Sequence, residues 1–98
     1  MKESLIRSKA IEILEKDGYR VWYPPRVKWI KEGDIWSVFD LMVINGGLRF
    51  IQLTTLSNVS ARKKKVLKFL LKCNTKIKAE VWGYDKKKRK FKIVEVSL

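Results

Sequence analysis

Two apolar stretches separated by three turn-forming residues constrain the fold of this chain most strongly. Residues 35–44 and 48–55 are rich in β-branched, aliphatic and aromatic side chains, which is typical of strands in the interior of a sheet. Asn45-Gly46-Gly47 lies between them and supplies the residue types that a tight hairpin requires. We therefore predict that the two stretches pair as an antiparallel hairpin.

The remaining segments alternate between helical and extended patterns. Residues 4–17 and 60–73 place apolar side chains at helical spacing, and we predict a helix in each. Short β-rich segments at 19–23, 79–84 and 91–96 predict three further strands. The order α-β-β-β-α-β-β predicts a single domain over all 98 residues, with an α+β fold in which helices pack on a mixed sheet.

Composition excludes several kinds of chemistry. The chain has no His and one Cys, which excludes His-dependent catalysis, an internal disulfide and a zinc site built from several cysteines. Cys73 falls on the apolar side of the second helix, and we expect it to be buried. No apolar run reaches the roughly 20 residues of a membrane span, and no signal-peptide pattern follows Met1. We therefore expect a cytoplasmic protein with no membrane partner.

Asp40 is the most unusual residue of the predicted hairpin. It lies in an apolar strand, where a buried carboxylate needs a partner. If residues 45–47 form a three-residue loop, Asp40 lies opposite Gln52, and Thr54 shares their face. A two-residue turn would place Asp40 opposite Ile51 instead. The first register predicts an oxygen-rich cluster suited to Mg²⁺ or Mn²⁺, and the alternative is an aspartate with a purely structural role.

Positive charge is concentrated in the second half of the chain. The 23 Lys and Arg exceed the 10 Asp and Glu by 13, and the segment 86–90 reads Lys-Lys-Lys-Arg-Lys. Such an excess in a folded domain favours a polyanionic partner, and we expect DNA. The residues that we expect to contact the DNA backbone are Arg26, Lys28, Arg62, Lys63, Lys64, Lys65, Lys68, Lys72, Lys87, Lys88 and Arg89.

The second predicted helix distributes its cations over two sides. The residues on the solvent side are Lys64, Lys65, Lys68 and Lys72. Arg62 and Lys63 instead flank the apolar side, one turn before Val66 and shortly after the strand that carries Gln52. These two cations could reach the polar cluster, or they could extend from the loosely packed first turn into water.

The tryptophans divide into two groups. Trp22, Trp36 and Trp82 alternate within predicted strands, and we expect them in the core. Trp29 is instead interleaved with basic residues, a pattern that suits stacking on distorted or single-stranded nucleic acid.

Two segments of the chain carry a resemblance to a known family. They read Gly33-Asp34-Ile-Trp-Ser-Val-Phe-Asp40-Leu-Met-Val-Ile and Arg49-Phe-Ile-Gln52-Leu-Thr54-Thr55. With the element order over about residues 4–84, they resemble the PD-(D/E)xK nuclease superfamily, and most of all its small archaeal Holliday-junction resolvases and the related restriction-type endonucleases. The resemblance implies a restriction-endonuclease-like fold, a homodimer, and Mg²⁺- or Mn²⁺-dependent cleavage of duplex or branched DNA.

The resemblance also implies roles for particular residues. Asp40 would be the metal-binding aspartate, and Gln52 stands where the family has Glu or, in some members, Gln. Glu12 in the first helix matches an acidic residue that some members place there, and Asp34 is a further carboxylate ahead of the strand. The implied metal ligands are therefore Asp40, Gln52, Glu12 and Asp34.

One departure from the family pattern concerns charge. The family lysine, which lies two residues after the Glu and positions the attacking water, is replaced by Thr54, which supplies no positive charge. Two hypotheses follow. Either the domain is an endonuclease in which Arg62 or Lys63 takes the place of the lysine, or it is a catalytically inactive DNA-binding module on the same fold.

Overall fold

The computed structural model describes residues 3–24, 35–36 and 38–98, so that Arg26, Lys28, Trp29 and Asp34 lie outside the described residues. The elements within these ranges are α1 (Glu3–Lys16), β1 (Arg20–Trp22), β2 (Leu41–Ile44), β3 (Leu48–Thr55), the short 3₁₀ helix η1 (Leu56–Asn58), α2 (Val59–Cys73), β4 (Lys78–Asp85) and β5 (Lys90–Val96). No helix among the described residues has the length and apolar character needed to cross a membrane.

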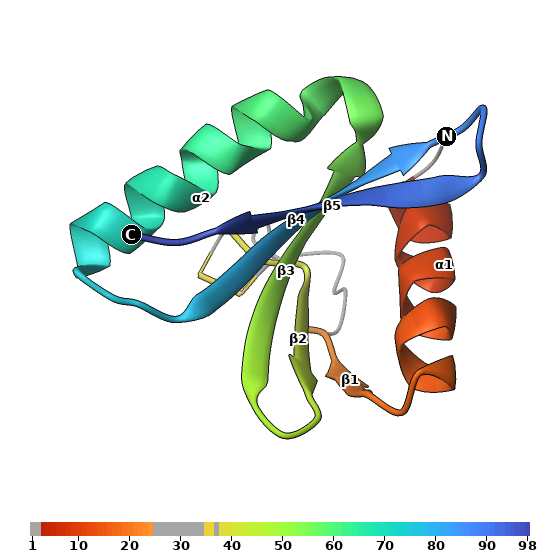
Figure 1. Ribbon diagram of the computed structural model, residues 1–98, viewed down its shortest axis with the longest axis horizontal. Coiled ribbons are helices and arrows are strands. Elements are labelled where there is room, and N and C mark those ends of the chain that lie inside the picture. The colour runs from red at the N-terminus through yellow and green to blue at the C-terminus, as the bar shows by residue number, and fades with distance from the viewer. Residues whose placement is uncertain (1–2, 25–34, 37) are drawn as a thin grey trace, which may run out of the picture.

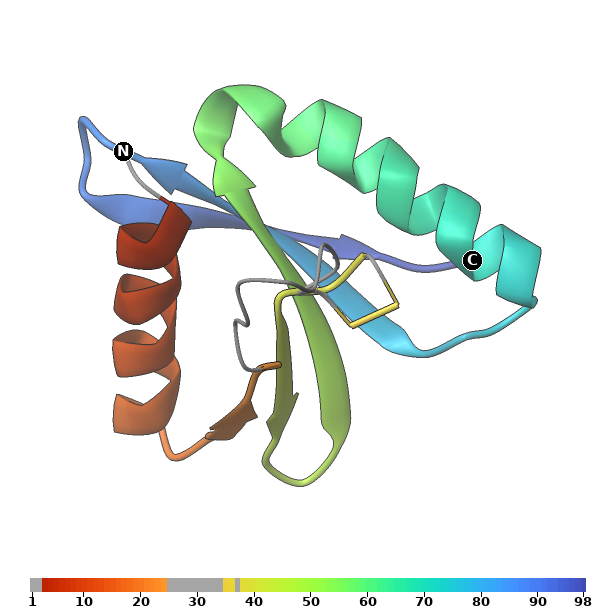
Figure 2. The same ribbon diagram turned by 180° about the vertical axis from the view of Figure 1, so that it is seen from behind.

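The five strands form one sheet in the order β1-β2-β3-β4-β5. Neighbouring strands are antiparallel except β3 and β4, which run parallel and are connected through α2. Successive residues of β3 belong to different hydrophobic clusters. Ile51 packs in the cluster that contains Leu14 of α1, whereas Phe50 packs in the cluster that contains Leu70 of α2. The helices therefore cover opposite faces of the sheet (Figures 1 and 2), and the predicted α+β class is confirmed.

The first helix packs through a narrow apolar stripe. Ile6, Ala10 and Leu14 recur at intervals of four residues and are buried against the sheet. The helix ends at Lys16, and Gly18 follows with a φ of +90°, in the left-handed region that glycine adopts without steric cost. The Tyr19 N–H then donates to the Leu14 carbonyl at 3.0 Å, which turns the chain back towards β1.

The start of the second helix lies close to the backbone of β4. A methyl group at Gly83 would overlap the side chain of Val59 and would lie 3.3 Å from the Cα of Leu56. Glycine at this position therefore lets η1 and the first turn of α2 settle on the sheet. At the other end of α2, Asn74 has a φ of +50° and its N–H donates to the Leu70 carbonyl. Asn74 therefore caps the helix in the left-handed backbone conformation that is common at helix C-termini.

One predicted strand is much shorter than expected, and two tryptophans that we expected in the core are exposed. The stretch 35–44 becomes a strand only at Leu41, because Ile35 and Phe39 close a small loop through reciprocal backbone hydrogen bonds of 2.7 and 3.0 Å. Trp36 lies in this loop and is 58% exposed. Trp22 is 51% exposed because it lies on the edge strand β1, whereas α2 packs on β3, β4 and β5. Only Trp82 among these three is buried, as predicted.

The prediction for Cys73 is also wrong. This residue is exposed, because it is the last residue of α2 and lies beyond Leu70, the last buried residue of the helix.

Candidate functional site

The hairpin has the register that brings the predicted polar residues together. Ile44 pairs with Leu48, which confirms the three-residue loop and excludes the two-residue turn. Beyond this register the Asp40 N–H donates to the Ile51 carbonyl at 2.8 Å, although Leu41 is the residue paired with Ile51, so the ladder is irregular at Asp40. Asp40 nevertheless lies close enough to Gln52 for the two side chains to form a hydrogen bond.

The carboxylate of Asp40 is held by two donors from β3. Its Oδ2 accepts hydrogen bonds from Gln52 Nε2 at 2.9 Å and from the Leu53 backbone N–H at 2.7 Å. Asp40 and Gln52 are each 3% exposed. Charge-assisted hydrogen bonds of this kind offset the desolvation of a buried carboxylate.

The side-chain amide of Gln52 leaves its oxygen without a donor. Nε2 gives a second hydrogen bond to the Leu53 carbonyl at 3.0 Å, so that both of its protons are used. Oε1 is buried, and no hydrogen bond from the described residues reaches it. A buried acceptor without a partner costs roughly 1–3 kcal/mol, and a cation or a donor from a ligand would relieve that cost.

The pair lies on the face of the sheet that α2 covers. Phe50, two residues before Gln52 in β3, belongs to the core that includes Val66 of α2. Thr54, two residues after Gln52, is 7% exposed and is the neighbour of Gly83 in β4. The three predicted polar residues of the cluster therefore share one face, as expected.

The two candidate cations at the start of α2 differ in burial. Arg62 is half-buried and lies three residues after Val59 and four before Val66, on the side of α2 that faces the sheet. Lys63 is exposed. Of the two, Arg62 is therefore the one that the helix directs to the face carrying Asp40.

The acidic ligands implied by the resemblance do not join Asp40 in the described part of the molecule. Glu12 is exposed on α1, which covers the opposite face, and it lines a hollow with Lys9, Tyr84 and Arg89. Asp34 lies outside the described residues. Within the described ranges, no group of three or more His, Cys, Asp or Glu residues could hold a metal ion. The polar contact at the predicted site is therefore that between Asp40 and Gln52.

The predicted phosphate-contacting cations are on the surface wherever the structure describes them, apart from half-buried Arg62. The exposed residues are Lys63, Lys64, Lys65, Lys68, Lys72, Lys87, Lys88 and Arg89. The carboxylate of Asp85 shapes the β4–β5 turn by accepting the backbone N–H groups of Lys87 and Lys88 at 3.0 and 3.2 Å. Lys88 also lines a hollow with Leu56 of η1, so that the basic turn lies next to the start of α2 (Figure 1).

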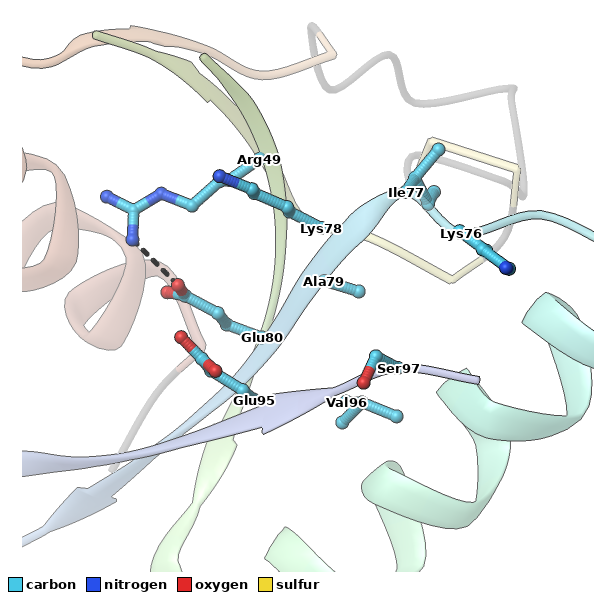
Figure 3. Close-up of a pocket in the computed structure, with 9 residues that line it drawn as sticks. All are labelled: Arg49, Lys76, Ile77, Lys78, Ala79, Glu80, Glu95, Val96 and Ser97. Atoms are coloured by element: carbon cyan, nitrogen blue, oxygen red, sulfur yellow. Dashed lines mark hydrogen bonds and ion pairs between the residues drawn. The ribbon is translucent and has the colours of Figure 1, made fainter. Parts of the chain in front are cut away.

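A second buried acid was not singled out by the sequence reasoning. Glu80 in β4 is 4% exposed; it forms an ion pair with Arg49 at 2.8 Å and accepts a hydrogen bond from Trp82 Nε1 at 2.8 Å. Figure 3 shows this ion pair in a hollow that Glu95 and Lys78 also line. The sequence pattern that could have identified Glu80 is an acid between two apolar residues of a predicted strand, Ala79 and Val81. The same pattern drew attention to Asp40.

Comparisons with known proteins give no assignment: no protein-family model matches the chain, and no curated protein matches it either.

Proposed function

We propose that this domain binds DNA and cleaves its phosphodiester backbone with the help of a divalent cation held by Asp40 and Gln52. The observation that carries the proposal is the buried Asp40–Gln52 contact of 2.9 Å, in which Gln52 Oε1 has no donor among the described residues. A buried polar atom without a hydrogen-bond partner is uncommon in folded proteins, and a bound ion would account for it.

The donor set suits a hard cation. A carboxylate and an amide oxygen are ligands that Mg²⁺ and Mn²⁺ accept, and Mg²⁺ is often held by one or two carboxylates together with waters and substrate phosphates. The Asp40 carboxylate and Gln52 Oε1 would hold the cation. Bound there, it would supply polarisation of a phosphate oxygen and activation of a water molecule.

In this proposal, residues other than Asp40 and Gln52 contact the phosphate and the DNA backbone. Arg62 supplies positive charge to the phosphate from the sheet-facing side of α2, a role that Thr54 cannot fill. The exposed lysines of α2 and of the β4–β5 turn contact the DNA backbone without reading its sequence. Cleavage of two strands of a branched substrate would require two such sites, and therefore a homodimer.

A second candidate function is DNA binding without cleavage. It is favoured by the state of Asp40, whose Oδ2 already accepts two hydrogen bonds, and by Thr54 at the position of the family lysine. In that case the pair would fix the β2–β3 register, and the basic surface alone would carry the function.

The two candidates are separated by a cleavage assay. Wild-type protein is incubated with duplex and branched DNA in Mg²⁺, Mn²⁺ or EDTA, and we expect nicking only with a cation. Asp40→Asn keeps an acceptor for the Leu53 N–H and should lose cleavage while it retains DNA binding. Glu12→Gln, on the opposite face, should cleave normally and is the control. Cleavage by Asp40→Asn at the wild-type rate would refute the proposal, and binding without cleavage by the wild type would favour the second candidate.

A further inference from the structure

Trp36 is held on the surface by an unusual backbone conformation. It is 58% exposed, and its φ of +52° lies in the left-handed region that bulky residues rarely adopt. Strained residues of this kind persist where the surrounding structure holds them and are concentrated at functional sites. The unusual conformation thus belongs to an aromatic residue that is largely exposed rather than packed in the core.

The ring of Trp36 packs against three phenylalanine rings. It stacks on Phe69 of α2, with centroids 5.7 Å apart and an interplanar angle of 22°, and lies 5.2 Å from the ring of Phe50. Phe39 contacts it edge-on at 6.5 Å. These contacts fix the orientation of the indole, while the residue as a whole remains largely exposed to solvent.

The ring of Trp36 lies on the same face of the sheet as the candidate site. Phe50 contacts Trp36 and shares one face of β3 with Gln52, two residues further along the strand. Lys65 and Lys72 are exposed one turn before and one turn after Phe69 on α2. A nucleobase can stack on a flat aromatic surface, and the neighbouring lysines can attract its phosphate.

We propose that Trp36 is a stacking platform for an unpaired nucleobase, and that the preferred DNA therefore contains single-stranded bases at a flap, gap or branch point. The inference rests on the proposed DNA binding but not on cleavage. The adjacent lysines favour a polyanionic strand over an apolar protein surface as the occupant.

The test compares the affinity for a labelled single-stranded oligothymidylate, an abasic strand of the same length and a matched duplex, by fluorescence anisotropy in EDTA. Trp36→Asn removes the ring but suits a positive φ, and Trp36→Phe retains an aromatic ring. Trp22→Thr removes another exposed tryptophan, from the edge strand β1, and is the matched control. Circular dichroism and thermal melting check that each variant is folded.

We expect Trp36→Asn to bind the single strand about 5- to 150-fold more weakly than the wild type, with duplex binding little changed. Trp36→Phe should recover much of the affinity, and Trp22→Thr should keep it. The wild type should bind the abasic strand as weakly as Trp36→Asn binds the normal one, a comparison that does not depend on the folding of any variant.

Three results would overturn the inference alone: equal wild-type affinity for the normal and abasic strands, an equal loss in Trp36→Asn and Trp22→Thr, or a Trp36-dependent dimer in light scattering that occupies this surface. Failure of the wild type to bind any of the three DNAs would instead overturn the proposed function, and this inference with it.

Discussion

Replacing Gln52 by Glu would turn the central attractive contact of the site into a repulsive one. In the wild type, Gln52 Nε2 donates to Asp40 Oδ2 at 2.9 Å, and both residues are 3% exposed. The variant Gln52→Glu removes this donor, and with it the hydrogen bond to the Leu53 carbonyl. It also places a second carboxylate beside the first, where both are buried.

The magnitude of the effect follows from this geometry. Two unit charges 2.9 Å apart repel by about 6 kcal/mol at an effective dielectric constant of about 20. Rotation of the side chain and uptake of a proton by one carboxyl group reduce this value. We therefore expect the free energy of unfolding in EDTA to fall by about 2–4 kcal/mol. For a chain of 98 residues, that change corresponds to a fall in Tm of roughly 10–30 °C.

A divalent cation should reverse this loss, because two carboxylates attract it more strongly than a carboxylate and an amide. A ligand that binds only the folded state adds about 2.7 kcal/mol at a concentration of about 100 times its Kd. The assay is thermal unfolding in EDTA, Mg²⁺ and Mn²⁺, with KCl added to match ionic strength. The double variant Asp40→Asn/Gln52→Glu exchanges the carboxylate and the amide and should regain most of the stability without a cation. Wild-type stability of Gln52→Glu in EDTA, or a loss that neither cation reverses, would refute the reasoning.

Further variants test other parts of the structure. Gly83→Ala should lower the free energy of unfolding by about 1–3 kcal/mol, because the new methyl group would overlap Val59; an unchanged midpoint in chemical denaturation would contradict the close packing of α2 on β4. Glu80→Gln should cost about 1 kcal/mol in the same assay, because the ion pair weakens while an acceptor for the indole N–H survives; a loss as large as that of Gln52→Glu would contradict this. Arg62→Ala should slow DNA cleavage about 100-fold with a small effect on binding, whereas Lys63→Ala should affect binding alone; equal effects of the two on the cleavage rate would show that burial does not distinguish them.

The hairpin and its polar pair could be predicted because local chemistry determines both. The three residues 45–47 fix the loop length, the loop length fixes the register, and the register brings Asp40 to Gln52. The order of helices and strands follows from periodicity in the same way, since each apolar face needs a layer to pack against.

Features that depend on distant contacts could not be predicted. An apolar run such as 35–44 has the same pattern in a strand as in a loop whose side chains reach the core, so the exposure of Trp36 was missed. The partner of Glu80 is Arg49, which is 31 residues away and becomes its neighbour only when β3 and β4 pair in parallel. The exposure of Cys73 depends on where α2 ends relative to its last buried residue, which helical periodicity does not reveal.

The central claim, that Asp40 and Gln52 together hold a divalent cation, is tested most directly by anomalous diffraction from crystals soaked in Mn²⁺. We predict an anomalous peak about 2.1 Å from a carboxylate oxygen of Asp40 and from Gln52 Oε1, at the buried acceptor that has no described donor. The peak should be lost in Asp40→Asn crystals soaked in the same way. A Mn²⁺-soaked structure in which Gln52 Nε2 still donates to Asp40 Oδ2 and no peak lies beside the pair would contradict the claim.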